Sequence, residues 1–211
     1  MAIFFYGAFL EGLINIFKFF YQFISIVLVF TLFISILFIP LNSEIKIIDF
    51  VETGELLWPA PGYNGINSYF GKRHAPTSGA STYHKGIDIA APQGSEYVAV
   101  TNGTITFVGF LGGGGYTVTL TDENTENGII KYSYCHSDPN LIVTIGQKVV
   151  KGQVIGKVGP KNVYGVEGNR YYDSKGNPTN GATTGPHLHF GMRVNGEYVN
   201  PLNYLRKKDK N

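Results

Sequence analysis

Residues 23–39 form a run of 17 apolar or hydroxyl side chains without a single charge. As an α-helix this run would rise about 26 Å, close to the ~30 Å hydrocarbon thickness of a bilayer. A helix that is apolar on every side needs a large protein around it, and a chain of 211 residues does not provide one. A cleaved signal peptide is a weaker alternative, because no short basic segment precedes the run and no small-residue cleavage site follows it. The run therefore predicts an uncleaved, single-pass membrane anchor at residues 21–41.

The segment before the anchor is also apolar, but polar positions interrupt it at helical spacing. These positions, three or four residues apart, are Gly7, Glu11, Asn15, Lys18 and Gln22. Such a stripe suits a helix that lies in the membrane interface or packs against a partner within the membrane. A second full span would place the Glu11 carboxylate at membrane depth, which is costly. We therefore expect residues 1–41 to combine an amphipathic segment with the anchor, and residues 1–40 to contact a membrane-protein complex.

Charge and cysteine content limit the classes of partner. Acidic residues outnumber lysines just after the anchor, which favours a cytoplasmic N-terminus and a following domain on the extracytoplasmic side of the cell membrane. The net charge of +2 is too small to indicate nucleic-acid binding, and the basic tail at 206–211 is expected to be a solvated terminus. The single cysteine, Cys135, excludes an intrachain disulfide and a cysteine-rich structural zinc site.

Short β-rich runs separated by turn signals follow a predicted stalk at residues 42–56. The runs rich in β-branched and aromatic residues are 96–100, 104–108, 116–120, 129–134 and 141–143. Turn signals fall at Asn102-Gly103, Asn127-Gly128, Lys151-Gly152 and Asn195-Gly196. No long amphipathic helix is expected after residue 60. The pattern predicts a mainly β domain over residues 57–205, with an antiparallel sheet or a β-sandwich.

Three of the five histidines lie in two short glycine-flanked segments. His187 and His189 are two apart, so on a strand both imidazoles would face the same side. His84 and Asp88 are four apart, which is also an even strand separation. Two neighbouring strands would thus present His, Asp and His to one ion, with a fourth position left to water as in catalytic zinc sites. Ordinary hydrogen-bonded histidines are the alternative, and the spacing alone leaves both interpretations open.

Two glycine-rich segments need their own interpretation. Residues 112–115 lack the Gly-Lys-Ser/Thr that would complete a phosphate-binding loop, so we expect a tight turn or a close approach of two backbone segments. Residues 161–184 are rich in Gly, Asn and Tyr and end just before His187. A loop of this length in a compact domain is either functional or disordered. We expect it to form a wall of the groove beside that histidine.

Seven segments in this order resemble the lysostaphin-type zinc metallopeptidases, which cut the peptides of bacterial peptidoglycan. The segments are 58–62 (WPAPG), 68–73 (SYFGKR), 84–92 (HKGIDIAAP), 134–136 (YCH), 146–156 (GQKVVKGQVIG), 184–190 (TGPHLHF) and 200–201 (NP). The resemblance covers roughly residues 57–205. It departs from the usual family pattern at Cys135 and Ser137 and in the length of the segment 161–184, which bears on specificity more than on activity.

The resemblance implies a set of roles. His84, Asp88 and His189 would bind Zn2+, and His136 and His187 would be the catalytic pair that does not coordinate the metal. The remaining histidine, His74, would be a loop residue or part of the groove lining. The implied function is a membrane-anchored zinc endopeptidase acting on peptidoglycan peptides. The anchor and its polar stripe add the hypothesis that it opens the wall locally within a larger envelope, secretion or conjugation complex. The alternative is a non-enzymatic wall-binding or scaffolding relative.

Overall fold

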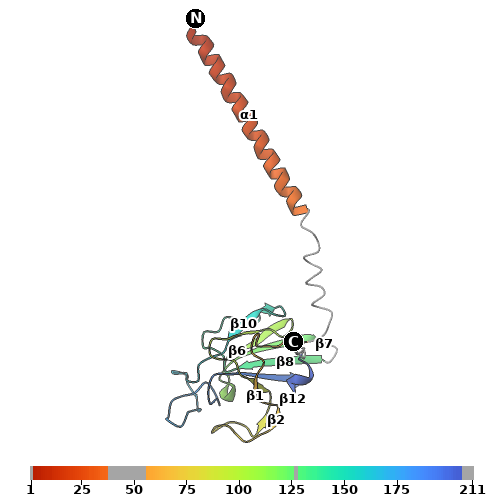
Figure 1. Cartoon of the computed structure of the whole chain (residues 1–211), viewed down its shortest axis with the longest axis vertical. Coiled ribbons are helices and arrows are strands. Elements are labelled where there is room, and N and C mark those ends of the chain that lie inside the picture. Colours follow the sequence, from red (N-terminus) through yellow and green to blue (C-terminus); the bar gives the residue numbers. More distant parts are fainter. Residues whose placement is uncertain (1, 38–55, 126–127, 206–211) are drawn as a thin grey trace. The chain divides into compact units, whose positions relative to one another are not determined.

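The computed structural model describes residues 2–37, 56–125 and 128–205 (Figure 1). The chain divides into two units, Met1–Gly54 and Glu55–Asn211, and each is described by itself. The predicted stalk up to residue 55, the end of the predicted anchor at 38–41 and the basic tail lie outside the described residues, so their boundaries stay predictions.

The first unit contains the helix α1 (Ala2–Leu37). The helix runs without a break through both the striped segment and the apolar run, so these two predicted parts belong to one element. Residues Ile14–Thr31 are long and apolar enough to cross a membrane, and none of them is buried within the protein. Within that stretch the Thr31 hydroxyl donates to the carbonyl oxygens of Val27 and Leu28, which satisfies its polar group inside the helix. The helix is therefore suited to apolar surroundings.

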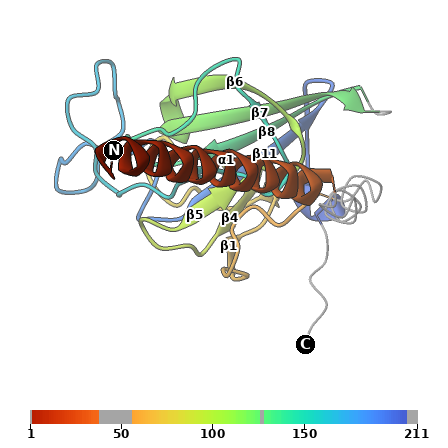
Figure 2. The same ribbon diagram turned by 90° about the horizontal axis from the view of Figure 1, so that it is seen from above.

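The second unit is built on one large antiparallel sheet and two small ones. The large sheet orders its strands β1 (Ile66–Ser68), β4 (Ile87–Ile89), β11 (Leu188–Val194), β8 (Gly128–Cys135), β7 (Tyr116–Thr125), β6 (Gly103–Phe110) and β9 (Lys148–Val149), and β12 (Glu197–Val199) also pairs with β11. The small sheets pair β10 (Val154–Lys157) with β5 (Glu96–Val98), and β2 (Gly71–Lys72) with β3 (Tyr83–His84). Figure 2 shows β6, β7, β8 and β11 side by side. The predicted mainly β, antiparallel fold is confirmed.

One face of the large sheet forms the hydrophobic core. Tyr132 and Tyr134 on β8 alternate with more polar neighbours and are fully buried, as is Phe190 on β11. The Tyr97 ring on β5 stacks on Tyr134 with ring centroids 5.1 Å apart, so the small sheet β5–β10 covers this face. The other face carries the alternate residues of the same strands, including His189. Burying one face thus sets the register that presents the histidine on the opposite face.

Local sequence signals explain several connections. Asn195 and Gly196 both have positive φ, 49° and 93°, as expected of the two central residues of a type I′ hairpin turn, and they join β11 to β12. Asn200 caps the 3-10 helix η2 (Pro201–Asn203) by accepting a hydrogen bond from the Leu202 amide. Residues 112–115 form the 3-10 helix η1 (Gly112–Gly114) and a close approach, because a Cβ at Gly115 would collide with the Asn180 carbonyl.

One predicted strand is wrong. Residues 141–143 form no strand, although Val143 is buried in the core. The Asp138 carboxylate accepts a hydrogen bond from the Asn140 amide, and the Leu141 amide donates to the Pro139 carbonyl. These local bonds close a turn in place of a ladder with a neighbouring strand. The apolar residues therefore anchor a loop in the core.

Candidate metal centre

Three elements bring the predicted ligand residues together. Asp88 on β4 lies directly opposite His189 on β11 in the antiparallel register, and His84 ends β3 shortly before β4. The Asp88 Oδ1 lies 3.0 Å from the His84 Nε2 and 2.8 Å from the His189 Nδ1. The two ring nitrogens are 2.9 Å apart. Three side chains from positions 84, 88 and 189 thus offer one ligand atom each within a single small triangle.

Hydrogen bonds around His84 make this triangle suited to a cation. The His84 Nδ1 lies 2.9 Å from the Tyr69 carbonyl oxygen, which only accepts, so this nitrogen carries the proton. In the neutral ring the Nε2 then carries a lone pair and no proton, and it faces the carboxylate of Asp88. Two acceptors at 3.0 Å without a proton between them are unfavourable unless a positive charge lies beside them. Zinc bonds of about 2.0–2.2 Å in a tetrahedron separate ligand atoms by roughly 3.3 Å, so the triangle fits with a small expansion.

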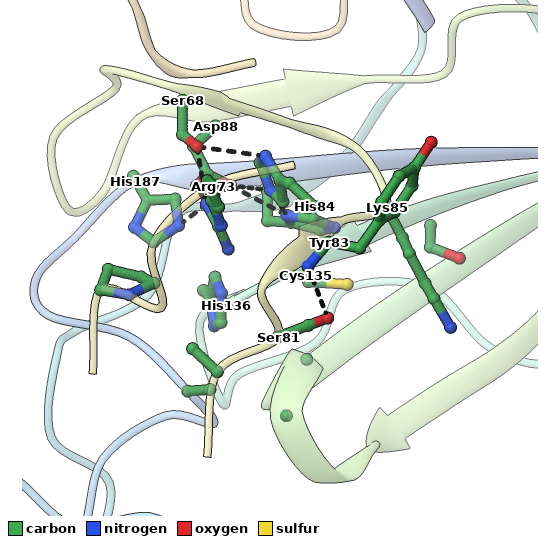
Figure 3. A pocket seen from close by; sticks show the side chains of 18 of the residues that line it. Ser68, Arg73, Ser81, Tyr83, His84, Lys85, Asp88, Cys135, His136 and His187 are labelled. Carbon is green, nitrogen blue, oxygen red and sulfur yellow. Dashed lines mark hydrogen bonds and ion pairs between the residues drawn. The ribbon is translucent and has the colours of Figure 1, made fainter. Parts of the chain in front are cut away.

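Arg73 fixes the other oxygen of the shared carboxylate. Its Nη1 donates to the Asp88 Oδ2 at 3.0 Å and to the Ser68 hydroxyl at 2.6 Å. The burial of Asp88 disfavours its charged form, but the polar rings of His187, His189 and His84 packed against the carboxylate outweigh burial and hold the pKa of this carboxyl far below its usual range. The carboxylate is therefore ionised near pH 7. Figure 3 shows Ser68, Arg73, Asp88 and His84 joined by these contacts.

His136 and His187 lie beside the triangle, with ring centroids 4.7 Å apart. The His136 Nδ1 lies 2.7 Å from the Asn180 carbonyl oxygen, and the His187 Nδ1 lies 2.9 Å from the Gly185 carbonyl oxygen. Each carbonyl accepts the Nδ1 proton, which leaves the Nε2 of each neutral ring as an acceptor. The His187 Nε2 is 3.5 Å from the Asp88 Oδ1. The structure therefore brings all five predicted site residues into one cluster.

Burial controls the charge of two of these rings. Burial, followed by repulsion from His187 and His189, lowers the pKa of His136 to about 3. Burial also lowers the pKa of His189, although its hydrogen bond to Asp88 opposes the shift. Both rings are consequently neutral near pH 7. A neutral imidazole can bind a metal through its lone pair or accept a proton from water.

The cluster opens into a cavity of about 630 Å³. The five site residues line it, together with His74, and the end of the segment 161–184 contributes Ala182 and Thr184. Residues 161–181 are absent from the lining, so the predicted wall consists only of the end of that segment. The segment acts in a second way that we did not predict, because the Asn180 carbonyl orients the His136 ring.

Sequence reasoning missed three residues that orient the site. Ser68 and Arg73 lie within the family-like segment 68–73, but nothing in the sequence indicated their contacts with Asp88 and His84. Asn180 lies in a loop with no motif, yet its side chain also accepts from the Tyr116 amide and donates to the Ser137 carbonyl. The departure at Ser137 has a structural role, since its buried hydroxyl lies 2.7 Å from the Tyr97 hydroxyl oxygen.

Cys135 lines the cavity without belonging to the metal triangle. It is buried and free, and burial raises the pKa of its thiol to about 11. A protonated thiol is neither a strong nucleophile nor a metal ligand. The residue packs as a small apolar side chain at the edge of the cavity.

Comparison with known proteins decides the family. A model of peptidase family M23 matches residues 82–201. The chain belongs to this family. It is 33% identical over 158 residues to the DD-carboxypeptidase/endopeptidase Mpg of Neisseria meningitidis, covering 72% of this chain and 31% of that protein. It is 29% identical over 125 residues to the murein hydrolase activator NlpD of Salmonella dublin, covering 59% of this chain and 27% of that protein.

Solved structures agree with this M23 assignment. A zinc-containing peptidase from Vibrio cholerae is 27% identical with a TM-score of 0.52, over 69% of this chain and 39% of that one. Lysostaphin from Staphylococcus simulans has a TM-score of 0.53 at 24% identity, over 72% of this chain and 54% of that one, and shows the same fold. The predicted lysostaphin-type family is confirmed. The M23 chain spans about a third of the length of the meningococcal relative, 31%.

Proposed function

We propose that the chain is a membrane-anchored zinc endopeptidase that hydrolyses peptide bonds of bacterial peptidoglycan. The observation that carries the proposal is the convergence of four histidines and Asp88 on one cavity. A relative that had lost catalysis would be free to lose any of these side chains, whereas this chain keeps the whole set with tautomers suited to it. His84, Asp88 and His189 would hold the ion, and His136 and His187 would transfer protons.

The chain's own residues supply orientation and proton transfer. A bound zinc ion would polarise the peptide carbonyl and make water a stronger nucleophile at neutral pH. His136 and His187 present an Nε2 acceptor each, so the pair takes a proton from the attacking water and returns it to the leaving amine. The carbonyls of Asn180 and Gly185 keep both rings in the required tautomer. Arg73 binds the Oδ2 of Asp88 and so would keep the Oδ1 turned toward the triangle.

The substrate class rests on the relatives. The meningococcal relative is named a DD-carboxypeptidase/endopeptidase, so we propose cross-linked peptides of peptidoglycan as the substrate of this chain. The chain covers only 31% of that protein, so we propose this substrate for the matching β domain and not for the whole chain. A cavity of about 630 Å³, open on one face of the sheet, accommodates several residues of an extended peptide.

The second candidate function is non-enzymatic. The Salmonella dublin relative is named a murein hydrolase activator, and it is 29% identical to this chain over 125 residues. An activator or wall-binding scaffold would use the groove to bind a partner or the wall without hydrolysis. The two functions differ in whether the purified chain cleaves peptidoglycan by itself.

The location is part of the same proposal. Helix α1 would anchor the chain in the cell membrane, with residues 21–41 as the span and the β domain on the extracytoplasmic side. Residues 1–40, which carry the polar stripe from Gly7 to Gln22, would contact membrane subunits of a larger envelope, secretion or conjugation complex. Copurification of such subunits in mild detergent through this segment supports the complex, and an isolated chain there argues against it.

Release of new amines from peptidoglycan sacculi tests the enzymatic function. The full chain, purified in detergent and loaded with zinc, is expected to release peptides that mass spectrometry identifies as cut cross-links. The matched control is His136→Ala, which keeps all three proposed ligands. A zinc-loaded wild-type chain that releases no amines, yet activates a separate hydrolase, would establish the activator function.

A further inference from the structure

The charges that line the cavity are unbalanced. Its three cationic side chains are Arg73, Lys85 and Arg193, and its one carboxylate is Asp88. Asp88 already pairs with Arg73 and belongs to the metal triangle. Within the part of the chain that the structure describes, neither Lys85 nor Arg193 forms an ion pair with another side chain. The cavity thus holds two positive charges that no carboxylate of the described residues neutralises.

The two charges gather around one aromatic ring. The Lys85 Nζ lies 4.8 Å from the ring centroid of Tyr198, and the Arg193 guanidinium carbon lies 5.2 Å from it. Arg193 and Tyr198 are directly paired across β11 and β12, so the sheet fixes their positions. Cation–π contacts hold both cations near the ring, but the cations repel one another. An anion bound beside the ring would relieve this repulsion.

The guanidinium of Arg193 also has an unused donor. Its Nε is shielded from solvent and has no hydrogen-bond partner in the described structure. Buried polar groups are nearly always hydrogen-bonded, so an orphaned donor at a binding cavity indicates a missing acceptor. A carboxylate offers two acceptor oxygens and pairs strongly with a guanidinium. The chemistry of the three side chains therefore matches a carboxylate.

The position of this group relates it to the proposed cleavage site. His189, Gly191 and Arg193 alternate along β11 and so share one face. At about 3.3 Å per residue, the Cα atoms of His189 and Arg193 are roughly 13 Å apart along the strand. Gly191 lies between them and also lines the cavity, and a Cβ there would lie only 3.2 Å from the Lys85 carbonyl oxygen, so a larger residue would crowd the strand against Lys85. Figure 3 shows Lys85 and His187 on opposite sides of His84.

We infer that Lys85, Arg193 and Tyr198 form a subsite for a carboxylate of the substrate peptide. An extended peptide lying along β11 places that carboxylate two to four residues from the cleaved bond, given the reach of the arginine side chain. The subsite rests on the proposed endopeptidase function and specifies its substrate. Peptides with free carboxylates are preferred to neutral ones such as glycine bridges or amidated stem peptides.

A binding measurement tests the subsite independently of cleavage. Fluorescent cross-linked muropeptides are prepared with free carboxylates and with the same carboxylates amidated. Their affinities are measured by fluorescence anisotropy for the full zinc-loaded chain in detergent, with His187→Ala to prevent turnover. The free-acid form is expected to bind at least tenfold more tightly. Lys85→Gln and Arg193→Gln are each expected to lower the affinity for the free-acid muropeptide about tenfold, because a charge-assisted hydrogen bond is lost. The affinity for the amidated muropeptide should stay unchanged.

Matched variants separate charge from structure. Lys85→Arg and Arg193→Lys keep the positive charge, and each is expected to bind the free-acid muropeptide within about threefold of the affinity of the chain without that substitution. Lys72→Gln removes an exposed lysine that does not line the cavity and changes nothing. Equal binding of both muropeptide forms, or an equal loss for both in the glutamine variants, overturns the subsite.

Cleavage by the chain with its catalytic histidines intact distinguishes the two proposals. If this chain cuts both forms with the same kcat/KM, the endopeptidase function stands and the carboxylate subsite fails. If it cuts neither form but binds the free acid preferentially, the subsite stands and the endopeptidase function fails.

Discussion

The two histidines of the H-x-H segment offer a direct test of the site, because the proposed function assigns them different roles. His189→Ala removes the Nδ1 that lies 2.8 Å from the Asp88 Oδ1 and 2.9 Å from the His84 Nε2. His187→Ala removes a ring whose Nε2 is 3.5 Å from the same oxygen and whose other nitrogen is held by the Gly185 carbonyl. The first change deletes one of three ligand atoms, and the second leaves all three.

The expected magnitudes follow from this difference. Loss of a residue that only orients a ligand costs about 10–100-fold in metal affinity, so loss of a ligand itself costs more. We expect His189→Ala to weaken zinc binding more than 100-fold, at least ~2.7 kcal/mol. His187→Ala should weaken it less than tenfold, under ~1.4 kcal/mol. Its kcat/KM should nevertheless fall about 10²–10⁴-fold, because a general acid–base group is lost.

Competition against a chromophoric zinc chelator measures the affinities, and amine release from sacculi measures activity. Thermal unfolding of each variant checks that the domain is intact. His74→Ala serves as a control for zinc affinity, since this exposed ring lines the cavity outside the triangle. Equal loss of zinc in His187→Ala and His189→Ala would refute the division between ligand and proton-transfer residue.

Three further predictions concern stability and ligand orientation. The pKa of His136 is about 3 in the metal-free fold and about 6.5 in the unfolded chain, so the unfolded state binds more protons between these values. The free energy of unfolding therefore decreases as the pH is lowered through this range. Urea unfolding in EDTA should show a loss of about 3 kcal/mol from pH 7 to 4 that His136→Gln lacks, and equal losses would disprove the assignment. Arg73→Lys should lower zinc affinity about 10–100-fold with little change in the melting temperature, and unaltered affinity would exclude a positioning role. Gly86→Ala places a Cβ 2.8 Å from the His189 Nε2, so chelator competition should show weaker zinc binding, and urea unfolding should show a loss of about 1–3 kcal/mol in stability. Gly65→Ala serves as the control, because its Cβ meets only Ala90, at 3.4 Å.

Local periodicity was enough to predict most of the sheet. The alternation in β8 and the Asn195-Gly196 turn are encoded by neighbouring residues, so the sequence predicts both. The failure at residues 141–143 has the same origin, because a run of β-branched residues indicates burial and extended backbone but not whether a neighbouring strand is available. There the Asp138 side chain and Pro139 close a turn. Pairing partners are a tertiary property that a three-residue run does not contain.

The candidate site divides in the same way. Ligand spacing and motif order predicted the five clustered residues, although their roles remain proposals. Arg73 and Asn180 could not be predicted, because their contacts join positions 15 and 44 residues apart through loops without periodicity. The uncovered charges of Lys85 and Arg193 depend on the register of β11 and β12, which is likewise absent from local sequence.

Main-chain carbonyls fix the protonation pattern of most of the histidines in this site. Three of the four clustered rings have their Nδ1 proton accepted by a main-chain carbonyl, those of Tyr69, Asn180 and Gly185. A carbonyl cannot donate, so each contact fixes one tautomer and directs an Nε2 lone pair toward the remaining members of the cluster. The fourth ring, His189, lies on β11 and uses its Nδ1 toward Asp88 instead. Substitutions in the two connections that carry these carbonyls, β1–β2 and β10–β11, would thus alter the groove while preserving the tautomers, as long as the backbone path is kept.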